Sequence, residues 1–478
     1  MTDYFSMFKA YDMRGTYPKI NKDVYYWVGR GLIEKIFKPQ GLPTELVLVR
    51  DARYTSPEFY QALVNGVQDA GGKALCLGIT STDFLYGATQ YFDLPGGIVT
   101  ASHNPKDDNG LKIVKGGSTM LGLENGLDLV RDFVLENIDS QKIDYASWKE
   151  PEINEAKFEE AKKYYISKLK EVGQIEKVNQ LLQSQNKKIK VAVDAGNGMG
   201  GFVMNIAKDL YTNIEFVDLY WELDGNYPNH PADPQNFENM KDLQKVIADN
   251  KDIAFGFAFD GDADRVFFVD ENAKIVQGDF LVAFFAKSLL EAYFAKPKPN
   301  LEPAVVYIQP GSRSVTEAIA EADGVAIPSK QGHTSIKAKM EQYKAVYGGE
   351  FSGHHYFADF GFMDSGALAA VLMIKILVLE DRKLSEIFAK LNNSYFISDL
   401  QAMKLPEGVD FEQVKMKLKA SYPDGNYSEM DGLSVFYPDW KFSIRPSNTE
   451  PVVKFIVETR VTNTVDEKLA RLLEVLKS

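Results

Sequence analysis

Short apolar runs alternate with amphipathic stretches through the first third of the chain. Residues 45–50 form a β-rich apolar run, and residues 73–78 and 97–100 form two more. Ser56 and Pro57 combine a helix-capping side chain with a proline suited to the first helical turn, so the spacing predicts a helix to about residue 69. This alternation predicts strands and helices packed in layers, as in α/β domains.

The same alternation recurs twice further along the chain. Residues 189–194 and 304–308 are short apolar runs, each followed by a turn that contains glycine and then by helical spacing. Charged helical segments at about 154–172 and 178–183 separate the first unit from the second, and prolines within residues 295–303 interrupt the third. No repeat is visible residue by residue, so we expect three units of similar architecture rather than copies of one sequence.

The last part of the chain, from about residue 394, has a different pattern. Residues 441–445 and 452–458 are predicted strands, and residues 464–477 have the spacing of a helix, which indicates a smaller α+β domain. Four domains agree with the length of 478 residues, since single domains usually hold about 100–150 residues. The expected fold class is α/β, with mixed sheets in residues 1–150, 151–273 and 274–392 and the α+β domain in residues 393–478.

Composition and charge narrow the class of protein. With 45% hydrophobic and 25% charged residues, the chain can fold without a partner. The formal net charge of −13 argues against non-specific nucleic-acid binding, so a phosphate ligand must be held by local basic groups. The single cysteine, Cys76, lies in an apolar run and is expected to be buried and unreactive. No signal segment or membrane span is evident, which predicts a cytoplasmic protein without a membrane partner.

Ser102 stands in a short loop directly after the apolar run 97–99, at the carboxyl end of a predicted strand. Ligands usually bind at such strand ends in α/β sheets. A serine here can act as a nucleophile, although hydroxyl groups in these loops more often only form turns. Ser102 by itself therefore leaves both interpretations open.

Three aspartates, Asp260, Asp262 and Asp264, alternate with small residues directly after another apolar run. In a straight strand their side chains would lie about 7 Å apart, so we expect Gly261 to let the loop curl until they converge. Carboxylate oxygens suit Mg²⁺, which also keeps open positions, and one of these could take an oxygen of a phosphoserine. A solvated acidic turn and a calcium loop are the alternatives; the compact spacing and the following Arg265 favour magnesium.

Two later loops contain the groups needed to bind a sugar phosphate. Residues 348–354 combine two glycines with the polar side chains of Glu350, Ser352 and His354, which offer the donors and acceptors that sugar hydroxyls need. A structural loop is the alternative there. The loop at residues 445–451 is suited to clamping a phosphate, although a solvated surface turn is the alternative. Its candidate ligands are Arg445, Ser447, Asn448 and Thr449.

Together these four segments resemble the α-D-phosphohexomutase family, particularly its phosphomannomutase/phosphoglucomutase branch. Residues 8–15, Phe-Lys-Ala-Tyr-Asp-Met-Arg-Gly, are similar to the family's N-terminal signature, and Asn-Gly-Leu-Lys at 109–112 follows the serine loop as it does in the family. The resemblance covers nearly the whole chain. Residues 330–333 match the third-domain loop only in part, and Gln309 stands where relatives often have a basic residue. Membership implies four domains around a central cleft, with the fourth closing over the sugar phosphate.

The resemblance also implies roles for the candidate residues. Ser102 is then the phosphorylated serine and shares the metal with the three aspartates. Glu350 and Ser352 contact sugar hydroxyls, and the loop that begins at Arg445 binds the non-reacting phosphate. The catalytic surroundings are formed by Arg14, Lys112, Arg265, His333 and His354.

The reaction implied is the interconversion of hexose 6-phosphate and hexose 1-phosphate, of mannose, glucose or both, through a phosphoserine and a hexose 1,6-bisphosphate. Mg²⁺ is the expected cofactor, the bisphosphate is the expected activator, and small-molecule sugar phosphates are the expected partners. Lys112 and His354 are the expected proton-transfer groups, because burial and neighbours could bring their pKa near the working pH.

Substrate preference depends on two further details. The pair Thr100-Ala101 and the amide of Asn448 favour the mannose/glucose branch, because the glucosamine branch tends to have glycine at the position of Asn448. The alternatives are a phosphoglucosamine mutase, a metal-dependent phosphatase, and a non-catalytic sugar-phosphate-binding protein on the same scaffold.

Overall fold

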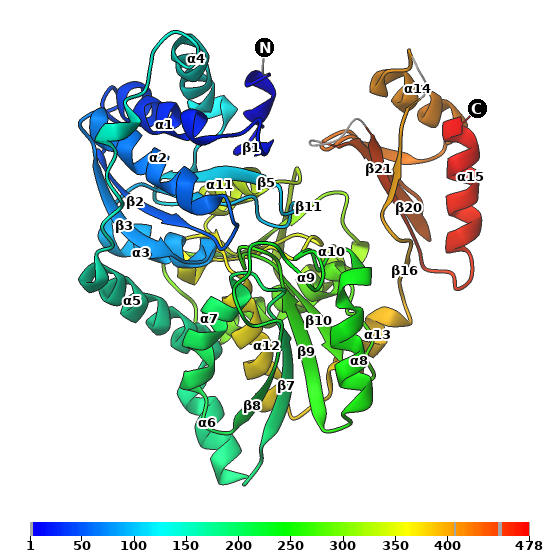
Figure 1. Cartoon of the computed structure of the whole chain (residues 1–478). Coiled ribbons are helices and arrows are strands. Elements are labelled where there is room, and N and C mark those ends of the chain that lie inside the picture. Colours follow the sequence, from blue (N-terminus) through cyan, green and yellow to red (C-terminus); the bar gives the residue numbers. More distant parts are fainter. Residues whose placement is uncertain (1–2, 406–407, 448–451, 478) are drawn as a thin grey trace. The chain divides into compact units, whose positions relative to one another are not determined.

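The structure is a computed structural model that describes residues 3–405, 408–447 and 452–477. The chain forms two compact units (Figure 1). Unit 1 holds Met1–Val276 and Ser352–Leu384, and unit 2 holds Gln277–Phe351 and Ser385–Ser478. The chain therefore leaves unit 1, returns to it for one segment, and ends in unit 2.

The first sheet of unit 1 is mixed. Its strands follow the spatial order β1-β5-β4-β2-β3, with β6 paired to β5. The pairs β2–β3 and β2–β4 are parallel, whereas β4–β5 and β1–β5 are antiparallel. The carboxyl ends of β2, β3 and β4 therefore meet at the sheet edge where β5 begins. The strands are β1 (Met13–Thr16), β2 (Glu45–Arg50), β3 (Lys73–Ile79), β4 (Gly96–Val99), β5 (Asp108–Gly116) and β6 (Thr119–Met120).

Helix ends in this part of unit 1 have clear local causes. The side chain of Asn21 accepts hydrogen bonds from the first turn of α1, and Ser81 does the same for α3. Pro57 lies in the first turn of α2, where its missing N–H costs nothing. The helices are α1 (Lys22–Gly31), extended by a π-helical segment (Leu32–Phe37), α2 (Ser56–Asp69), α3 (Thr82–Phe92) and α4 (Leu127–Asn137).

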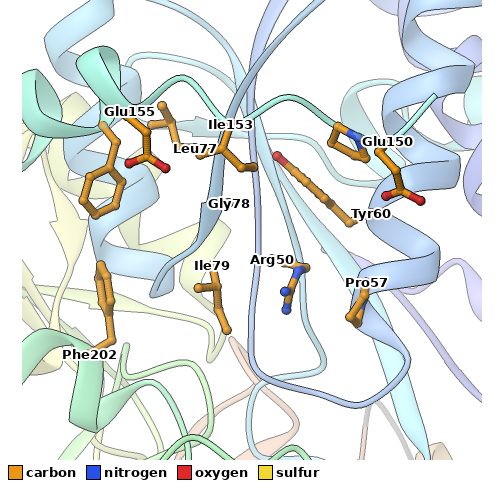
Figure 2. A pocket seen from close by; sticks show the side chains of 12 residues that line it. Arg50, Pro57, Tyr60, Leu77, Gly78, Ile79, Glu150, Ile153, Glu155 and Phe202 are labelled. Atoms are coloured by element: carbon orange, nitrogen blue, oxygen red, sulfur yellow. The ribbon is translucent and has the colours of Figure 1, made fainter.

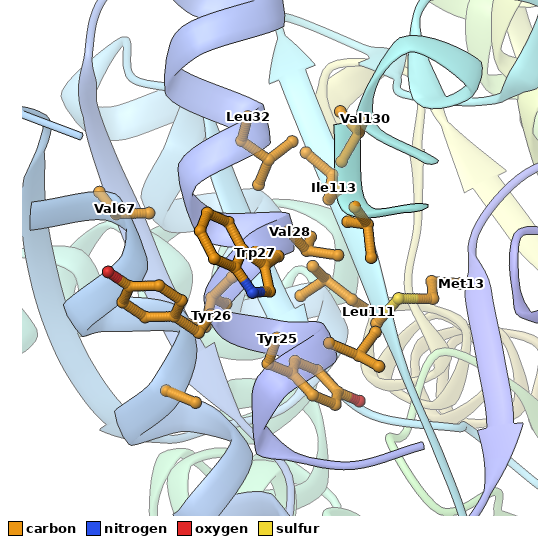
Figure 3. Packing of buried hydrophobic residues seen from close by; sticks show 14 of the residues in the cluster. Met13, Tyr25, Tyr26, Trp27, Val28, Leu32, Val67, Leu111, Ile113 and Val130 are labelled. Carbon is orange, nitrogen blue, oxygen red and sulfur yellow. The ribbon is translucent and has the colours of Figure 1, made fainter. Parts of the chain in front are cut away.

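Side chains of α1 pack on strands β1 and β5 and form the core beside this sheet (Figure 3). Trp27 is 2% exposed and Leu111 is 1% exposed, so each burial stabilises the fold by roughly 1.5–3 kcal/mol. Neighbouring side chains alternate between the two faces of a strand. Because Met13 and Leu111 point into this core, Arg14 and Lys112 project from the opposite face.

A second sheet in unit 1 has the order β10-β9-β7-β8. β9 and β10 form an antiparallel hairpin in which Phe259 pairs with Val266, whereas β7 is parallel to both β8 and β9. Its strands are β7 (Ile189–Asp194), β8 (Ile214–Leu219), β9 (Ile253–Phe259) and β10 (Val266–Asp270). The remaining elements of unit 1 are α5 (Glu155–Gly173), α6 (Ile175–Ser184), α7 (Gly200–Ala207), α8 (Lys241–Asp249), β14 (His355–Phe357), β15 (Met363–Asp364) and α12 (Gly366–Glu380).

Unit 2 contains a parallel arrangement and an antiparallel one. β11 pairs in parallel with β12 and β13, and the chain then forms an antiparallel sheet of order β16-β21-β20-β19-β18 near its end. The first group comprises α9 (Gly278–Ala295), β11 (Glu302–Ile308), α10 (Arg313–Glu321), β12 (Val325–Ser329), α11 (His333–Tyr343) and β13 (Ala345–Gly349). The second comprises α13 (Leu384–Asn392), β16 (Phe396–Ile397), β17 (Gln401–Met403), α14 (Phe411–Ser421), β18 (Asn426–Ser428), β19 (Leu433–Phe436), β20 (Trp440–Pro446), β21 (Val453–Thr459) and α15 (Val465–Lys477).

The expected fold class is confirmed, because the chain builds mixed α/β sheets followed by a smaller α+β part. Strands expected at 45–50 and 189–194 have those bounds. Cys76 is buried, as expected. The four domain boundaries stay a prediction. In the described part of the chain, no helix has both the length and the apolar character needed to cross a membrane.

Candidate active site

Ser102 lies in the loop that joins β4 to β5. Its φ of 53° is in the left-handed region, which a residue with a side chain adopts only when its surroundings enforce it. The side chain is fully buried. The backbone N–H of Ser102 donates to Thr100 Oγ1 at 2.9 Å. The loop therefore holds Ser102 in one strained conformation.

A buried arginine, Arg53, fixes this serine loop. Its guanidinium is completely buried and lies beside Asp51, with 3.3 Å between Arg53 Nε and Asp51 Oδ2. No sequence pattern singles out Arg53, which lies three positions after the end of β2 at the same sheet edge as the serine loop. At distances of 2.7–2.9 Å the guanidinium donates to the backbone carbonyl oxygens of Ser102, Asn104, Pro105 and Asp108.

Asp260, Asp262 and Asp264 lie in the tight turn between β9 and β10. As expected, their side chains converge: one carboxylate oxygen of each lies within 4.8 Å of the others, and all three residues are buried. The expectation that Gly261 allows this curl is wrong, because the residue of the turn with a left-handed backbone is Ala263, with a φ of 63°. A Cβ on Gly261 would instead lie 2.3 Å from the carbonyl oxygen of Ser102. The missing side chain therefore lets the acidic turn touch the serine loop.

The donor set of this cluster fits a magnesium ion. Asp262 Oδ1 and Asp264 Oδ1 are buried and accept no hydrogen bond within the described residues, a costly state for a carboxylate oxygen without a cation. Ser102 Oγ donates to Asp260 Oδ2 at 2.8 Å, so the hydroxyl lies beside the potential ligand atoms. These oxygens are the hard ligands that Mg²⁺ prefers.

Lys112 supplies positive charge at this cluster. Its Nζ donates to Asp262 Oδ2 at 2.7 Å and to Asp264 Oδ2 at 2.5 Å. Burial lowers the pKa of Lys112, but the two carboxylates outweigh burial and raise that pKa above its usual value. The pKa of Lys112 is therefore shifted away from the working pH, opposite to the expected shift. Burial, together with repulsion from Asp264 and Asp262, raises the pKa of Asp260 well above its usual value.

Arg265 and His354 form a chain of hydrogen bonds next to the aspartates. Arg265 Nε donates to His354 Nε2 at 2.9 Å, and His354 Nδ1 lies 2.7 Å from Asp364 Oδ2. Because arginine only donates, Nε2 must accept and the proton must be on Nδ1, which donates to Asp364. Both ring nitrogens of His354 are thus engaged, and the imidazole holds Arg265 in place. Asp364, which sequence analysis did not single out, lies in β15.

Arg14 contacts the serine loop. Its Nε donates to Asp12 Oδ2 at 2.7 Å, and its Nη1 donates to Asn104 Oδ1 at 2.6 Å and to the carbonyl oxygen of Ala101 at 3.3 Å. Arg14 therefore lies next to Ser102, as the family signature implies.

Thr82, at the first residue of α3, is a second contact that sequence analysis missed. Its hydroxyl donates to Asp262 Oδ2 at 2.5 Å. This oxygen also accepts from Lys112 Nζ and, at 3.5 Å, from Thr100 Oγ1, so Asp262 Oδ2 has three donors, whereas Oδ1 has none among the described residues. Thr82 and Lys112 together orient the carboxylate.

The predicted sugar-binding residues Glu350 and Ser352 and the predicted catalytic residue His333 are divided between the two units. Ser352 belongs to unit 1, and Glu350 and His333 belong to unit 2. Glu350 directly follows β13 and is 2% exposed, whereas His333 begins α11. Their substrate contacts stay predictions.

The predicted phosphate clamp lies in unit 2. Arg445 is in β20, and its Nη1 donates to the carbonyl oxygen of Pro446 at 3.2 Å. Ser447 directly follows that strand. Asn448 and Thr449 lie outside the described residues. The role of this loop also stays a prediction.

A buried serine hydroxyl lies beside converging carboxylates, with Lys112 and Arg265 fixed next to them, which are the groups that phosphoryl transfer needs for alignment and charge neutralisation. Comparison with known proteins gives the family. Residues 6–128, 163–274 and 277–395 match the sequence models of phosphoglucomutase/phosphomannomutase alpha/beta/alpha domains I, II and III. The chain belongs to this family, the α-D-phosphohexomutases. It is therefore an enzyme, an intramolecular phosphotransferase that interconverts hexose phosphates.

Individual relatives extend the match over the whole chain. The chain is 31% identical to a phosphomannomutase from Vibrio cholerae serotype O1, covering 98% of both proteins. It is 32% identical to a phosphoglucomutase from Neisseria gonorrhoeae, covering 99% of this chain and 97% of that protein. The crystal structure of a phosphoglucomutase/phosphomannomutase family protein from Burkholderia thailandensis is 27% identical, with a TM-score of 0.80 over 100% of this chain and 98% of that one. The resemblance inferred from the motifs is confirmed.

Proposed function

We propose that the enzyme moves a phosphoryl group between the 1- and 6-positions of a hexose through a phosphorylated Ser102. The observation that carries this proposal is the 2.8 Å contact between Ser102 Oγ and Asp260 Oδ2 within the buried carboxylate cluster. Phosphoryl transfer needs alignment and charge neutralisation more than covalent chemistry by the protein. The Ser102 hydroxyl is held in a fixed position beside the carboxylate cluster, which would provide the alignment and, with a bound cation, the charge neutralisation.

Mg²⁺ is the proposed cofactor, with Asp260, Asp262, Asp264 and an oxygen on Ser102 as its ligands. When bound, the ion supplies Lewis-acid chemistry, neutralising the charge on the oxygens of the transferred group. The buried Oδ1 atoms of Asp262 and Asp264, which accept no hydrogen bond within the described residues, support this assignment.

The side chains of this protein align and neutralise the phosphoryl group. Phosphorylated Ser102 gives its group to the free hydroxyl of a bound hexose monophosphate, and the resulting hexose 1,6-bisphosphate turns in the site and returns its other phosphate to Ser102. The bisphosphate is therefore also the activator. Lys112 and Arg265 stabilise the charge, and Arg14 supports the loop. Lys112 and His354 are the proposed proton-transfer groups, although the raised pKa of Lys112 favours its charged form.

Mannose and glucose phosphates are the proposed substrates. Relatives named phosphomannomutase and phosphoglucomutase, each about as similar to this chain as the other, support dual use. Glu350 and Ser352 would contact the hydroxyls at positions 3 and 4, which the two hexoses share, and His333 is a further proposed catalytic residue. A more distant relative, an N-acetylphosphoglucosamine mutase from Aspergillus fumigatus that is 16% identical with a TM-score of 0.55, was solved with glucose 1,6-bisphosphate, which supports that ligand. The phosphate clamp would consist of Arg445, Ser447, Asn448 and Thr449.

Specificity constants for mannose 1-phosphate, glucose 1-phosphate and glucosamine 6-phosphate test the substrate proposal. We expect the first two to agree within roughly a hundredfold, the span of one or two contacts at about 1.4 kcal/mol per tenfold, and the third to be clearly lower. A constant for glucosamine 6-phosphate above both others would overturn the choice of substrate and leave the mutase chemistry standing. Inorganic phosphate is measured in the same assays, because its net release would indicate a phosphatase.

A further inference from the structure

A pocket of about 480 Å³ lies within unit 1 (Figure 2). Its lining comes from β2, β3, α2, the segment at 150–153, the first turn of α5, and Phe202 of α7. The volume is in the range of pockets that bind small molecules, about 300–1,000 Å³. None of the residues proposed for phosphoryl transfer lines it.

Arg50 places a positive charge in this pocket. Figure 2 shows its side chain between Ile79 and Pro57. The side chain is half-buried, and its Nη1 donates to the carbonyl oxygen of Asp51 at 3.0 Å. Over the described ranges of the chain, Arg50 forms no ion pair. A guanidinium has five N–H donors, so most of its capacity to bind an anion is unused.

The walls and rim of the pocket restrict the ligand further. Ile153, Phe158 and Phe202 form an apolar wall, and the two phenylalanine rings lie 6.4 Å apart between centroids. Glu150 and Glu155 at the rim are exposed carboxylates. They repel an anion with several charges, so the pocket favours a molecule with one anionic group and an apolar body.

Two strand ends connect the pocket with the catalytic loops. Arg50 ends β2, and three positions later Arg53 holds the serine loop. Ile79 ends β3, and three positions later Thr82 binds Asp262. The backbone N–H of Thr80 donates to the carbonyl oxygen of Arg50 at 3.0 Å, which joins the two strand ends.

We propose that this pocket is a second ligand site, which binds a small molecule with one anionic group and an aromatic or branched apolar body, and that its occupancy changes the rate of the enzyme. The anionic group pairs with Arg50, and the apolar body lies against Phe158 and Phe202. A sugar phosphate fits this description poorly, because it has no apolar body and carries up to two negative charges. The ligand class of the pocket therefore differs from that of the active site.

Binding is tested with 8-anilinonaphthalene-1-sulfonate, a fluorescent monoanion with an aromatic body, and with uncharged N-phenyl-1-naphthylamine as the matched probe. We expect saturable binding of the sulfonate at one site per chain by calorimetry. Arg50→Gln should weaken it about tenfold, the effect of losing one charge-assisted pairing, while Arg50→Lys should weaken it less. The uncharged probe should bind both variants as it binds the parent. Arg382→Gln, which changes an exposed arginine of unit 1, is the control and should bind the sulfonate like the parent.

Circular dichroism and thermal unfolding confirm that each variant is folded. Equal sulfonate affinity in the parent and in folded Arg50→Gln, or no saturable binding to the parent, would overturn the proposal. The test of the effect on rate rests on the proposed mutase function. Saturating sulfonate should change the parent's initial rate with glucose 1-phosphate at least about twofold, and it should leave the rate of Arg50→Gln unchanged. Binding at Arg50 without any change in rate would overturn the coupling, and the binding arm gives a result even if the substrate proposal fails.

Discussion

Arg53 allows a sharp test of how the serine loop is held. Arg53→Met removes a buried guanidinium that donates to four carbonyl oxygens and leaves Asp51 buried without its cation. Breaking a buried ion pair by removing one partner typically costs 3–5 kcal/mol, so we expect about that loss in the free energy of unfolding. Arg53→Lys keeps the charge but offers only three donors, without the planar fork, and should lose about 1–3 kcal/mol.

Arg53→Lys should also lower kcat more than it raises KM. A serine loop displaced by about 1 Å can cost roughly a hundredfold in rate, although the sugar contacts are untouched. Urea unfolding and steady-state kinetics on Arg53→Lys measure both effects, and Arg30→Lys, a change in a partly exposed pair with Glu34, is the control and should stay within about 0.5 kcal/mol. A folded Arg53→Lys enzyme with the parent's kcat would refute the reasoning.

Three further predictions concern single groups near the site. Asp262→Asn should weaken Mg²⁺ binding in calorimetry and slow phosphoryl transfer far more than it weakens sugar binding; full activity of the parent in excess chelator would exclude the metal role. Gly261→Ala should cost about 1–3 kcal/mol and lower kcat, because its Cβ would lie 2.3 Å from the carbonyl oxygen of Ser102, whereas Gly97→Ala, whose nearest contact is 3.5 Å, should be milder; equal kcat in both variants would contradict this. Burial raises the pKa of Asp83 to about 6, so the folded protein retains this proton above about pH 4, where the unfolded chain loses it. The free energy of unfolding should therefore fall as the pH rises from about 4 to 6, by up to about 3 kcal/mol, and Asp83→Asn should remove that fall; the same pH dependence in both proteins would count against it.

Local patterns were enough to predict the elements and the acidic turn. Strands such as β2, β7 and β9 are short apolar runs with β-branched or aromatic residues, and this signal does not depend on what packs against them. The three aspartates follow such a run directly, so their convergence could be expected from chain connectivity. How the turn closes could not, because the left-handed φ at Ala263 and the contact of Gly261 with the serine loop depend on a second segment.

Two of the three contacts that the sequence patterns did not predict join distant parts of the chain, and the third joins residues ten positions apart. Arg53 reaches the serine loop from the end of β2, Thr82 reaches Asp262 from α3, and Asp364 reaches His354 from β15. The sequence around a single polar residue does not indicate which residue it will contact in the fold.

The return of residues 352–384 to unit 1 has a related cause. Helix α12 is apolar on nearly all sides and packs on α5, α6 and α7. An all-round apolar helix is predicted to be buried, but its sequence does not say which elements cover it.

The central claim is that Ser102 carries the phosphoryl group, and intact-protein mass spectrometry with peptide mapping tests it most directly. The enzyme is incubated with glucose 1,6-bisphosphate and Mg²⁺, freed of ligand, and measured before and after addition of a hexose monophosphate. We predict one phosphate on Ser102 that is lost to the sugar, none in Ser102→Ala, and almost no turnover by that variant. Ser140→Ala, which changes an exposed serine in the turn after α4, is the control and should turn over normally. Full turnover by folded Ser102→Ala, or turnover by the parent without phosphate on Ser102, would contradict the account.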